Sequence, residues 1–205
     1  MAELNEIKTK TADMSKLALR MWKTTYQSFM EHDRDLIQGI LDDENKVNNF
    51  EKEITADLIN LSRTSSEKSK KSRAIVYADI VGDLELIGDY CKDILERVQT
   101  KIDEKLLFSK DAVEDYTDLY RKTEDALEEI VCALEKDKPG LAKEVLKSKE
   151  SIDSLVDKYR LRHNQRLING VCSPMACNMF LNMLDFTAAV YHHAGKIASN
   201  LLKIK

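Results

Sequence analysis

Pairs of acidic residues four positions apart are the feature of this 205-residue sequence that could carry chemistry. On a helix this spacing places two carboxylates on one face, where they can share a cation but repel each other by roughly 0.2–0.5 kcal/mol without one. The pairs are Glu31/Asp35, Asp79/Asp83, Glu85/Asp89, Asp111/Asp115, Glu114/Asp118, Glu124/Glu128 and Asp125/Glu129. Because the spacing is so frequent, it favours a solvated helix face for any one pair, and a metal site needs a further reason.

No arrangement typical of catalysis accompanies these pairs. The chain has no glycine-rich phosphate-binding loop, and its cysteines, Cys91, Cys132, Cys172 and Cys177, contain no CxxC pair. Cys132 and Cys172 have no evident paired His and acid, so we interpret them as small core residues. The cysteine pattern indicates a reduced, cytosolic protein, and we expect no enzymatic activity.

Arg162, His163 and Arg166 form a local basic cluster just before an Asn169-Gly170 turn. The net charge of the chain is −4, which argues against nucleic acid as a partner and against attraction to anionic lipid. We therefore interpret these three residues as a surface that binds a protein partner. The alternative is that the positive charges only stabilise a helix C-terminus.

Turn-forming residues divide the chain into six long helices. Six Gly and two Pro leave few places where the chain can turn. The candidate capping and breaking residues are Asp33, Thr64 to Ser66, Ser109, Asp137 before Pro139, and Ser173 before Pro174. The predicted helices cover residues 3–31, 34–63, 68–104, 110–136, 139–168 and 174–203.

The third predicted helix shows how these helices pack. Its apolar residues recur at alternating steps of three and four, which is typical of a coiled-coil-like seam in an elongated bundle. They are Ala74, Tyr77, Val81, Leu84, Gly88, Cys91, Leu95, Val98 and Ile102. The most apolar stretch, 175–191, contains Asn178, Asn182 and Asp185 and is too short to span a bilayer, so we expect no direct membrane insertion.

The same plan occurs twice along the chain. Residues 30–33 resemble residues 134–137, and residues 47–50 match residues 152–155, at an offset of 103 to 105 residues. Each match is followed by a polar turn and a third apolar helix. We predict an all-α fold of two tandem, pseudo-symmetric three-helix bundles, formed by residues 1–104 and 105–205.

Two stretches carry a resemblance to a known family. Residues 81–90, with the sequence VGDLELIGDY, resemble the G-D-L-E-R-I-G-D-[HLY] motif of the PhoU family, with Leu86 in place of Arg. Residues 161–174 resemble the R-H-x-x-R-L-x-x-G-x-C-S-P segment of the PhoU domain that follows the membrane part of bacterial Na⁺/phosphate cotransporters. The resemblance implies two three-helix bundles side by side. It also implies a regulator of phosphate uptake and signalling that contacts a transporter or its partners.

The resemblance also implies a metal site, because some members of the family bind iron or another divalent metal through acidic pairs on neighbouring helices. Glu85 and Asp89 fall on the family motif, and Glu44 and Asn48 occupy the matching pair on the second helix. Asn48 offers a carbonyl oxygen without charge, which weakens the site. Asp83 is a further, weaker candidate from the same helix.

The matching positions of the second repeat have diverged further. The family pairs align with Ala188 and His192 on one helix and with Lys149 and Asp153 on the other. A lysine at a ligand position opposes metal binding, so Asp153 and His192 are the weaker candidates. We expect any tight metal site to lie in the first half.

These observations favour a non-catalytic, cytoplasmic regulator of phosphate uptake. Docking to a phosphate transporter or cotransporter would hold it at the inner face of the membrane, with or without a bound metal, and a homo-oligomer is compatible with this role. One alternative is a metal-binding bundle for iron storage or di-metal chemistry, but its Glu-x-x-His motifs are absent. The other is a structural helical adaptor without metal.

Overall fold

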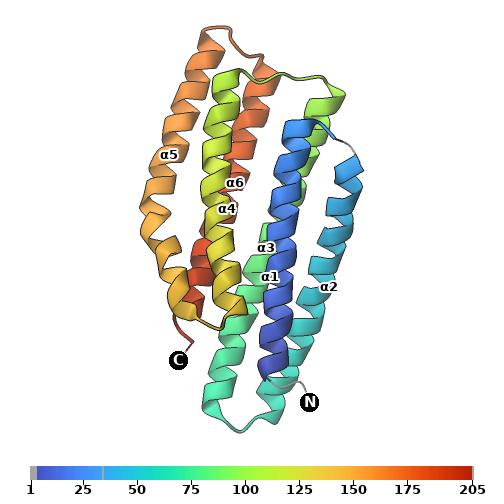
Figure 1. Ribbon diagram of the computed structural model, residues 1–205, viewed down its shortest axis with the longest axis vertical. Helices are drawn as coiled ribbons and strands as arrows, with labels where there is room; N and C mark the ends of the chain where they lie inside the picture. Colours follow the sequence, from blue (N-terminus) through green and yellow to red (C-terminus); the bar gives the residue numbers. More distant parts are fainter. Residues whose placement is uncertain (1–3, 34, 205) are drawn as a thin grey trace.

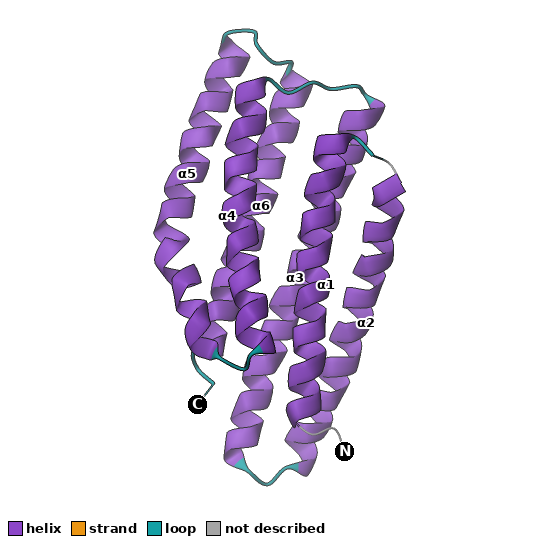
Figure 2. Cartoon of the chain, in the orientation of Figure 1, coloured by secondary structure: helices purple, strands orange, loops and turns teal. Residues whose placement is uncertain are grey.

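The computed structural model describes residues 4–33 and 35–204, and the side chains of these residues except 148–151. This part of the chain consists of helices joined by short connections and contains no strand (Figures 1 and 2). The elements are α1 (Leu4–Glu31), α2 (Asp35–Thr64), α3 (Lys68–Asp103), α4 (Lys110–Glu135), the 3₁₀ turn η1 (Pro139–Ala142), α5 (Lys143–Ile168) and α6 (Pro174–Leu201). The all-α prediction is confirmed.

The helix limits follow from local capping. Ser109 and Ser173 begin α4 and α6, and their hydroxyls accept hydrogen bonds from the backbone amides three residues on, at 3.2 Å each. The observed limits lie within two residues of the predicted ones, except that α5 starts at Lys143. Pro139 and its neighbours form a separate 3₁₀ turn there, with a hydrogen bond from the Leu141 amide to the Lys138 carbonyl. The predicted helix starts at residues 3 and 34 lie outside the described residues.

Helices α1, α2 and α3 lie beside α4, α5 and α6 in one elongated bundle (Figure 1). Helix α3 packs along α6, and α1 packs along α4. The α3–α4 connection, residues 104–109, and the α5–α6 connection, residues 169–173, meet at one end of the bundle, which we call the loop end. The two chain termini lie toward the opposite end. The duplication of residues 1–104 and 105–205 stays a prediction.

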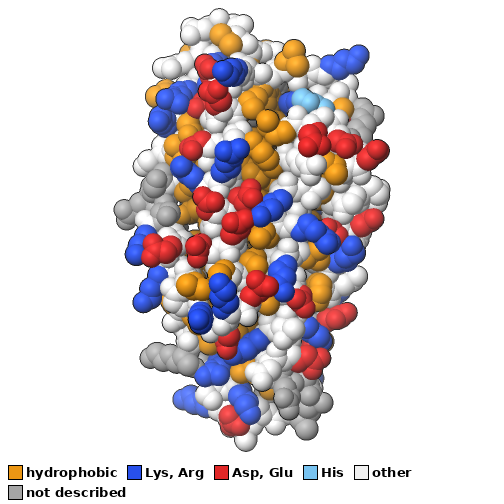
Figure 3. Space-filling model, in the orientation of Figure 1, with side chains coloured by type: hydrophobic (Ala, Val, Ile, Leu, Met, Phe, Trp, Pro, Cys, Tyr) orange, Lys and Arg blue, Asp and Glu red, His pale blue; other side chains and the backbone are white. Residues whose placement is uncertain are grey.

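A shared apolar core joins the two sets of helices. The Trp22 ring of α1 is fully buried and stacks on the Tyr120 ring of α4 with 3.9 Å between ring centroids. The Tyr26 ring also stacks on the Tyr120 ring, with 4.8 Å between ring centroids. On the surface, acidic and basic side chains are interspersed, and hydrophobic side chains gather along the middle of the face shown (Figure 3). Burial along the α1–α4 and α3–α6 contacts therefore fixes the positions of the polar residues described next.

Candidate functional site

Four carboxylates of α2 and α3 interact electrostatically in the first half, and three of them belong to the predicted metal residues. Glu44 is buried, and its Oε1 accepts hydrogen bonds from Asn48 Nδ2 at 3.0 Å and from Lys92 Nζ at 3.4 Å. Burial raises the pKa of Glu85, and so do the charges of Asp89, Glu51 and Glu44, in that order after burial. We call Glu44, Glu51, Glu85 and Asp89 the acidic cluster.

Gly88 explains why α2 and α3 approach each other here. A Cβ added at Gly88 would lie 3.3 Å from Val47 Cγ1, so a side chain at this position would require Val47 to shift. The residues flanking this contact, Glu85 and Asp89 on α3, are thereby brought to Glu44 and Asn48 on α2. The structure thus brings together the four residues predicted from the family motif, whereas metal binding by them stays a prediction.

Glu51 is a member of the acidic cluster that sequence reasoning missed. It lies seven residues after Glu44, which returns it to the same face of α2 after two helical turns. The spacing is visible in the sequence, but the family motif ends before it. Burial is the main cause of the raised pKa of Glu85, and the charges of the neighbouring carboxylates raise it further; a bound cation would offset that second contribution.

Asp83 does not join the acidic cluster. It is two residues from Glu85, so it points to a different side of α3. There its Oδ1 lies 2.7 Å from Nδ1 of His193 on α6, and both side chains are about nine-tenths buried. This contact ties the two halves of the bundle together, and it uses one of the two carboxylate oxygens of Asp83.

The second half keeps only a pair at the matching place. His192 Nε2 lies 3.1 Å from Asp153 Oδ1, and both side chains are partly exposed. The two predicted residues are therefore neighbours across α5 and α6. The side chain of Lys149 lies outside the described residues.

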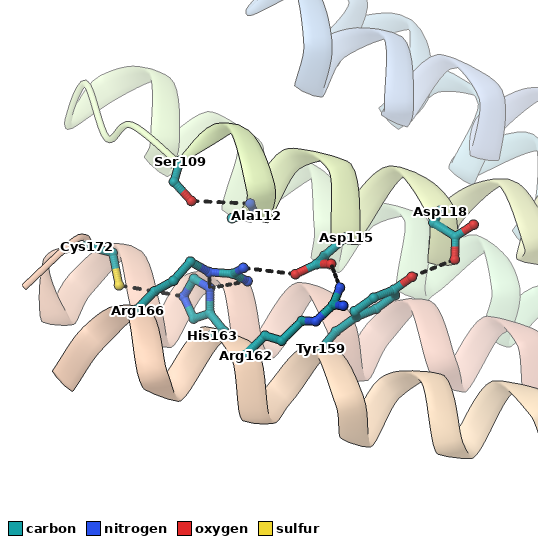
Figure 4. A network of polar contacts seen from close by, with 9 residues as sticks. All are labelled: Ser109, Ala112, Asp115, Asp118, Tyr159, Arg162, His163, Arg166 and Cys172. Atoms are coloured by element: carbon teal, nitrogen blue, oxygen red, sulfur yellow. Dashed lines mark hydrogen bonds and ion pairs between the residues drawn. The ribbon is translucent and has the colours of Figure 1, made fainter. Parts of the chain in front are cut away.

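The predicted basic cluster is organised by Asp115 of α4 (Figure 4). Arg162 Nη1 donates to Asp115 Oδ1 and Arg166 Nη1 donates to Asp115 Oδ2, at 2.9 Å each. The Asp115 side chain is only 7% exposed, and that of Arg166 only 11%. Sequence reasoning missed Asp115 as the partner because it is about fifty residues away from the arginines, and only the packing of α4 on α5 reveals the pair.

His163 is buried rather than exposed, so its side chain does not form part of the surface, and its role in partner binding stays a prediction. Its residue is 1% exposed, and its ring stacks on Phe180 of α6 with 3.9 Å between centroids. Burial, and then the charge of Arg166, lower the pKa of His163 to about 4. Of the three predicted partner-binding residues, Arg162 has the most exposed side chain, at 49%.

Cys172 also differs from its interpretation as a core residue without a paired His. Its Sγ lies 4.0 Å from Nε2 of His163, and the two side chains face each other (Figure 4). Cys177 lies near both: the ligand atoms of His163, Cys172 and Cys177 all fall within 4.8 Å of one another. The neutral imidazole and two thiols thus form a second polar group, separate from the acidic cluster.

Within the described residues, none of the helices has the length and apolar character that crossing a membrane requires.

Comparison with known proteins identifies the first half most directly. Residues 11–98 match the family model described as "PhoU domain". No curated protein gives a significant match. The matched range includes residues 81–90, so the PhoU resemblance of that stretch is confirmed. It does not reach residues 161–174, and their similarity to the cotransporter-associated domain stays a prediction.

Solved structures match along the whole chain at low sequence identity. The crystal structure of PhoU from Pseudomonas aeruginosa has a TM-score of 0.91 at 16% identity, covering 98% of this chain and 96% of that one. The phosphate transport system regulatory protein PhoU from Streptococcus pneumoniae has a TM-score of 0.86 at 15% identity, covering 98% and 94%. A putative PhoU-like phosphate regulatory protein from Shewanella oneidensis has a TM-score of 0.68 at 14% identity, covering 100% and 97%. The six-helix fold therefore extends through both halves.

Proposed function

We propose that this chain, which belongs to the PhoU family, is a non-catalytic regulator of phosphate uptake that docks onto a phosphate transporter or cotransporter. The family assignment supports a phosphate-regulatory role. The similar protein from Streptococcus pneumoniae is described as a regulator of a phosphate transport system, which favours a transport protein as the partner here as well.

The observation that carries the docking proposal is the exposure of large apolar side chains at the loop end. Leu107 is 83% exposed and Ile168 is 82% exposed, and Val171 and Met175 are also exposed. They lie on or beside the two connections that meet there (Figure 1). Exposed apolar side chains that gather in one region of a protein are typical of a protein interface. The loop end is therefore the docking surface that the structure favours.

Polar residues border this surface on the α4–α5 side. A pocket of about 430 Å³ is lined by acidic side chains of α4 and basic side chains of α5, including Asp111, Glu114 and Arg162. Because Arg162 and Arg166 share the single carboxylate of Asp115, which offsets one of their two positive charges, these arginines supply mainly directional contacts at the rim. The apolar side chains would supply most of the affinity.

Charged substitutions at the loop end test the docking directly. We expect Ile168→Glu/Val171→Glu to abolish control of phosphate uptake, because buried glutamates at the interface would cost more than the contact provides. Ile75→Glu is the matched control, since Ile75 is 66% exposed but lies on α3 near the opposite end. Phosphate uptake is measured in phosphate-rich and phosphate-poor cells, with helicity and melting checked on the purified variants. Uptake control that survives in the double variant, or that the control loses equally, contradicts the proposal.

We further propose that the acidic cluster holds iron or a divalent metal as part of this regulator. The support is electrostatic: after burial, the charges of Asp89, Glu51 and Glu44 raise the pKa of Glu85, and Asn48 is hydrogen-bonded to Glu44. Elemental analysis of protein purified without chelator should show metal that Glu85→Ala/Asp89→Ala removes. The matched pair Asp153→Ala/His192→Ala should leave it in place. Metal that is lost in Asp153→Ala/His192→Ala but kept in Glu85→Ala/Asp89→Ala would show that the site lies in the second half, against the proposal.

A further inference from the structure

We propose that His163, Cys172 and Cys177 form a binding site for a thiophilic metal ion, of which Zn²⁺ is the representative, at the junction of α5 and α6. Their ligand atoms lie within 4.8 Å of one another, and they share no residue with the acidic cluster. One imidazole and two thiolates are the donors that Zn²⁺ prefers among protein side chains. The proposal is independent of the docking function, although the site lies at the loop end.

The local sequence builds the site by reversing the chain within a few residues. Gly170 takes a φ of 69°, and the amides of Gly170 and Val171 donate to the carbonyls of Leu167 and Arg166 at 3.0 and 2.9 Å. This is a Schellman motif, which ends α5 and turns the chain back toward it. Ser173 and Pro174 then start α6 at once. Cys172 is consequently placed just before α6, and Cys177 within its first turns, both facing His163 across the junction.

The distances suit a metal ion after small movements. Zn–S bonds of about 2.3 Å and Zn–N bonds of about 2.0 Å place tetrahedral ligand atoms roughly 3.5–3.8 Å apart. The observed separation of His163 Nε2 and Cys172 Sγ is 4.0 Å. His163 and Cys177 sit on helices whose backbones are fixed by hydrogen bonds, whereas Cys172 lies in the α5–α6 connection, so the adjustment falls to side-chain rotation and to the backbone around Cys172.

The burial pattern leaves one side of the site open. His163 and Cys177 are buried at 1% and 3% exposure, whereas Cys172 is half-buried at the edge of the connection. Three protein ligands with one accessible side describe a site whose fourth position is taken by water. Binding of Zn²⁺ converts the two thiols to thiolates and releases their two protons to solvent, so the charge of the bound group is neutral.

Arg166 must respond when the ion binds. It donates from Nε and Nη2 to His163 Nδ1 at 3.3 and 3.2 Å, which leaves the imidazole proton on Nε2. Coordination through Nε2 requires that proton to move to Nδ1, and the Arg166 guanidinium must then turn away from the ring. Its shorter bond, 2.9 Å from Nη1 to Asp115, can remain. The affinity is accordingly lower than that of a site with four protein ligands.

Titration of the purified, reduced full-length chain with Co²⁺ tests the site, since Co²⁺ reports thiolate ligation through an intense ultraviolet charge-transfer band and tetrahedral geometry through its visible bands. We expect both signals, and we expect Zn²⁺ to displace them. Cys172→Ser should lose the thiolate signal and weaken binding by more than about 100-fold, the upper end of what outer-shell substitutions cost. Cys132→Ser is the matched control, because Cys132 is another partly exposed thiol that lies outside the site. It should behave as the parent chain does.

Two further variants separate this site from its alternatives. Cys177→Ser should repeat the effect of Cys172→Ser, whereas Glu85→Ala/Asp89→Ala should leave the thiolate band unchanged. A Co²⁺ spectrum without thiolate bands, or one that Cys172→Ser leaves intact, overturns the proposal. So does a chain that binds no Co²⁺ when reduced and forms a Cys172–Cys177 disulfide on exposure to a peroxide, since the pair would then be a redox couple. In that reaction each thiol loses one hydrogen atom, and hydrogen peroxide is reduced to two water molecules.

Discussion

At the scale of single residues, His163 has the environment that departs most from solution. Its ring stacks on Phe180 and accepts hydrogen bonds from Arg166 at Nδ1, and burial, followed by the positive charge of Arg166, lowers its pKa to about 4. In the unfolded chain the pKa returns to about 6.5. Between about pH 4 and pH 6.5 the imidazole is therefore protonated in the unfolded state but largely neutral in the folded state.

This difference predicts an acid-sensitive fold. A depressed His pKa has no effect on stability above about pH 6.5, and it lowers stability as pH falls from there toward 4, by up to about 3 kcal/mol. Chemical denaturation in the presence of chelator should show that loss in the parent chain. His163→Gln removes the titrating group, so its stability should depend less on pH over this range, whatever its offset at neutral pH. Parallel pH profiles for the two proteins would rule out His163 as the cause.

The same residues show which parts of a site can be predicted from sequence. Glu44, Asn48, Glu85 and Asp89 were predicted as one group because a motif and a helical period link them, and the structure brings them together. Asp115 could not be assigned to Arg162 and Arg166, because that ion pair depends on how α4 packs against α5. Burial of His163 could not be predicted either, since a cluster of basic residues before a turn is typical of an exposed segment. Local periodicity can be recognised in the sequence, whereas pairing between residues of distant helices depends on how the helices pack.

At the scale of elements, three helices end on the same kind of turn with different residues in the left-handed position. Gly170 follows α5 with a φ of 69°, whereas Lys105 follows α3 with a φ of 52° and Asp137 follows α4 with a φ of 49°. An L side chain in this region costs roughly 1 kcal/mol, which glycine avoids. The helix limits were predictable from caps and prolines, but these non-glycine turns were not, because Lys and Asp carry no strong turn signal for this conformation.

A reciprocal pair of substitutions tests this account of the helix ends. Lys105→Gly should stabilise the chain by about 0.5–1 kcal/mol, since it relieves backbone strain at a small entropic cost in the unfolded state. Gly170→Ala should destabilise it by about 1 kcal/mol, because a Cβ there meets no atom within 4 Å and only the backbone conformation is penalised. Urea denaturation gives both values. A Lys105→Gly variant that is less stable than the parent, or a Gly170→Ala variant that is more stable, would show that the turns are not strained as described.

At the scale of the whole molecule, the bundle is asymmetric along its length. The acidic cluster lies along the side of α2 and α3, while the loop end collects the exposed apolar residues of the α3–α4 and α5–α6 connections. The proposed thiolate site lies at this same end and joins α5 to α6. A partner that binds the loop end would contact both halves of the chain, because α3 belongs to the first half and α5 to the second.

Site-specific cross-linking in living cells tests the docking claim most directly. A photoreactive side chain is placed at Ile168 or, as the matched control, at Ile75, both of which are largely exposed at 82% and 66%. After illumination, the products are identified by mass spectrometry of the membrane fraction. We expect the residue at position 168 to capture a membrane subunit of a phosphate transporter and the residue at position 75 not to capture it. Capture of that subunit from position 75 alone, or from neither position while phosphate uptake is still controlled by the chain, would contradict it.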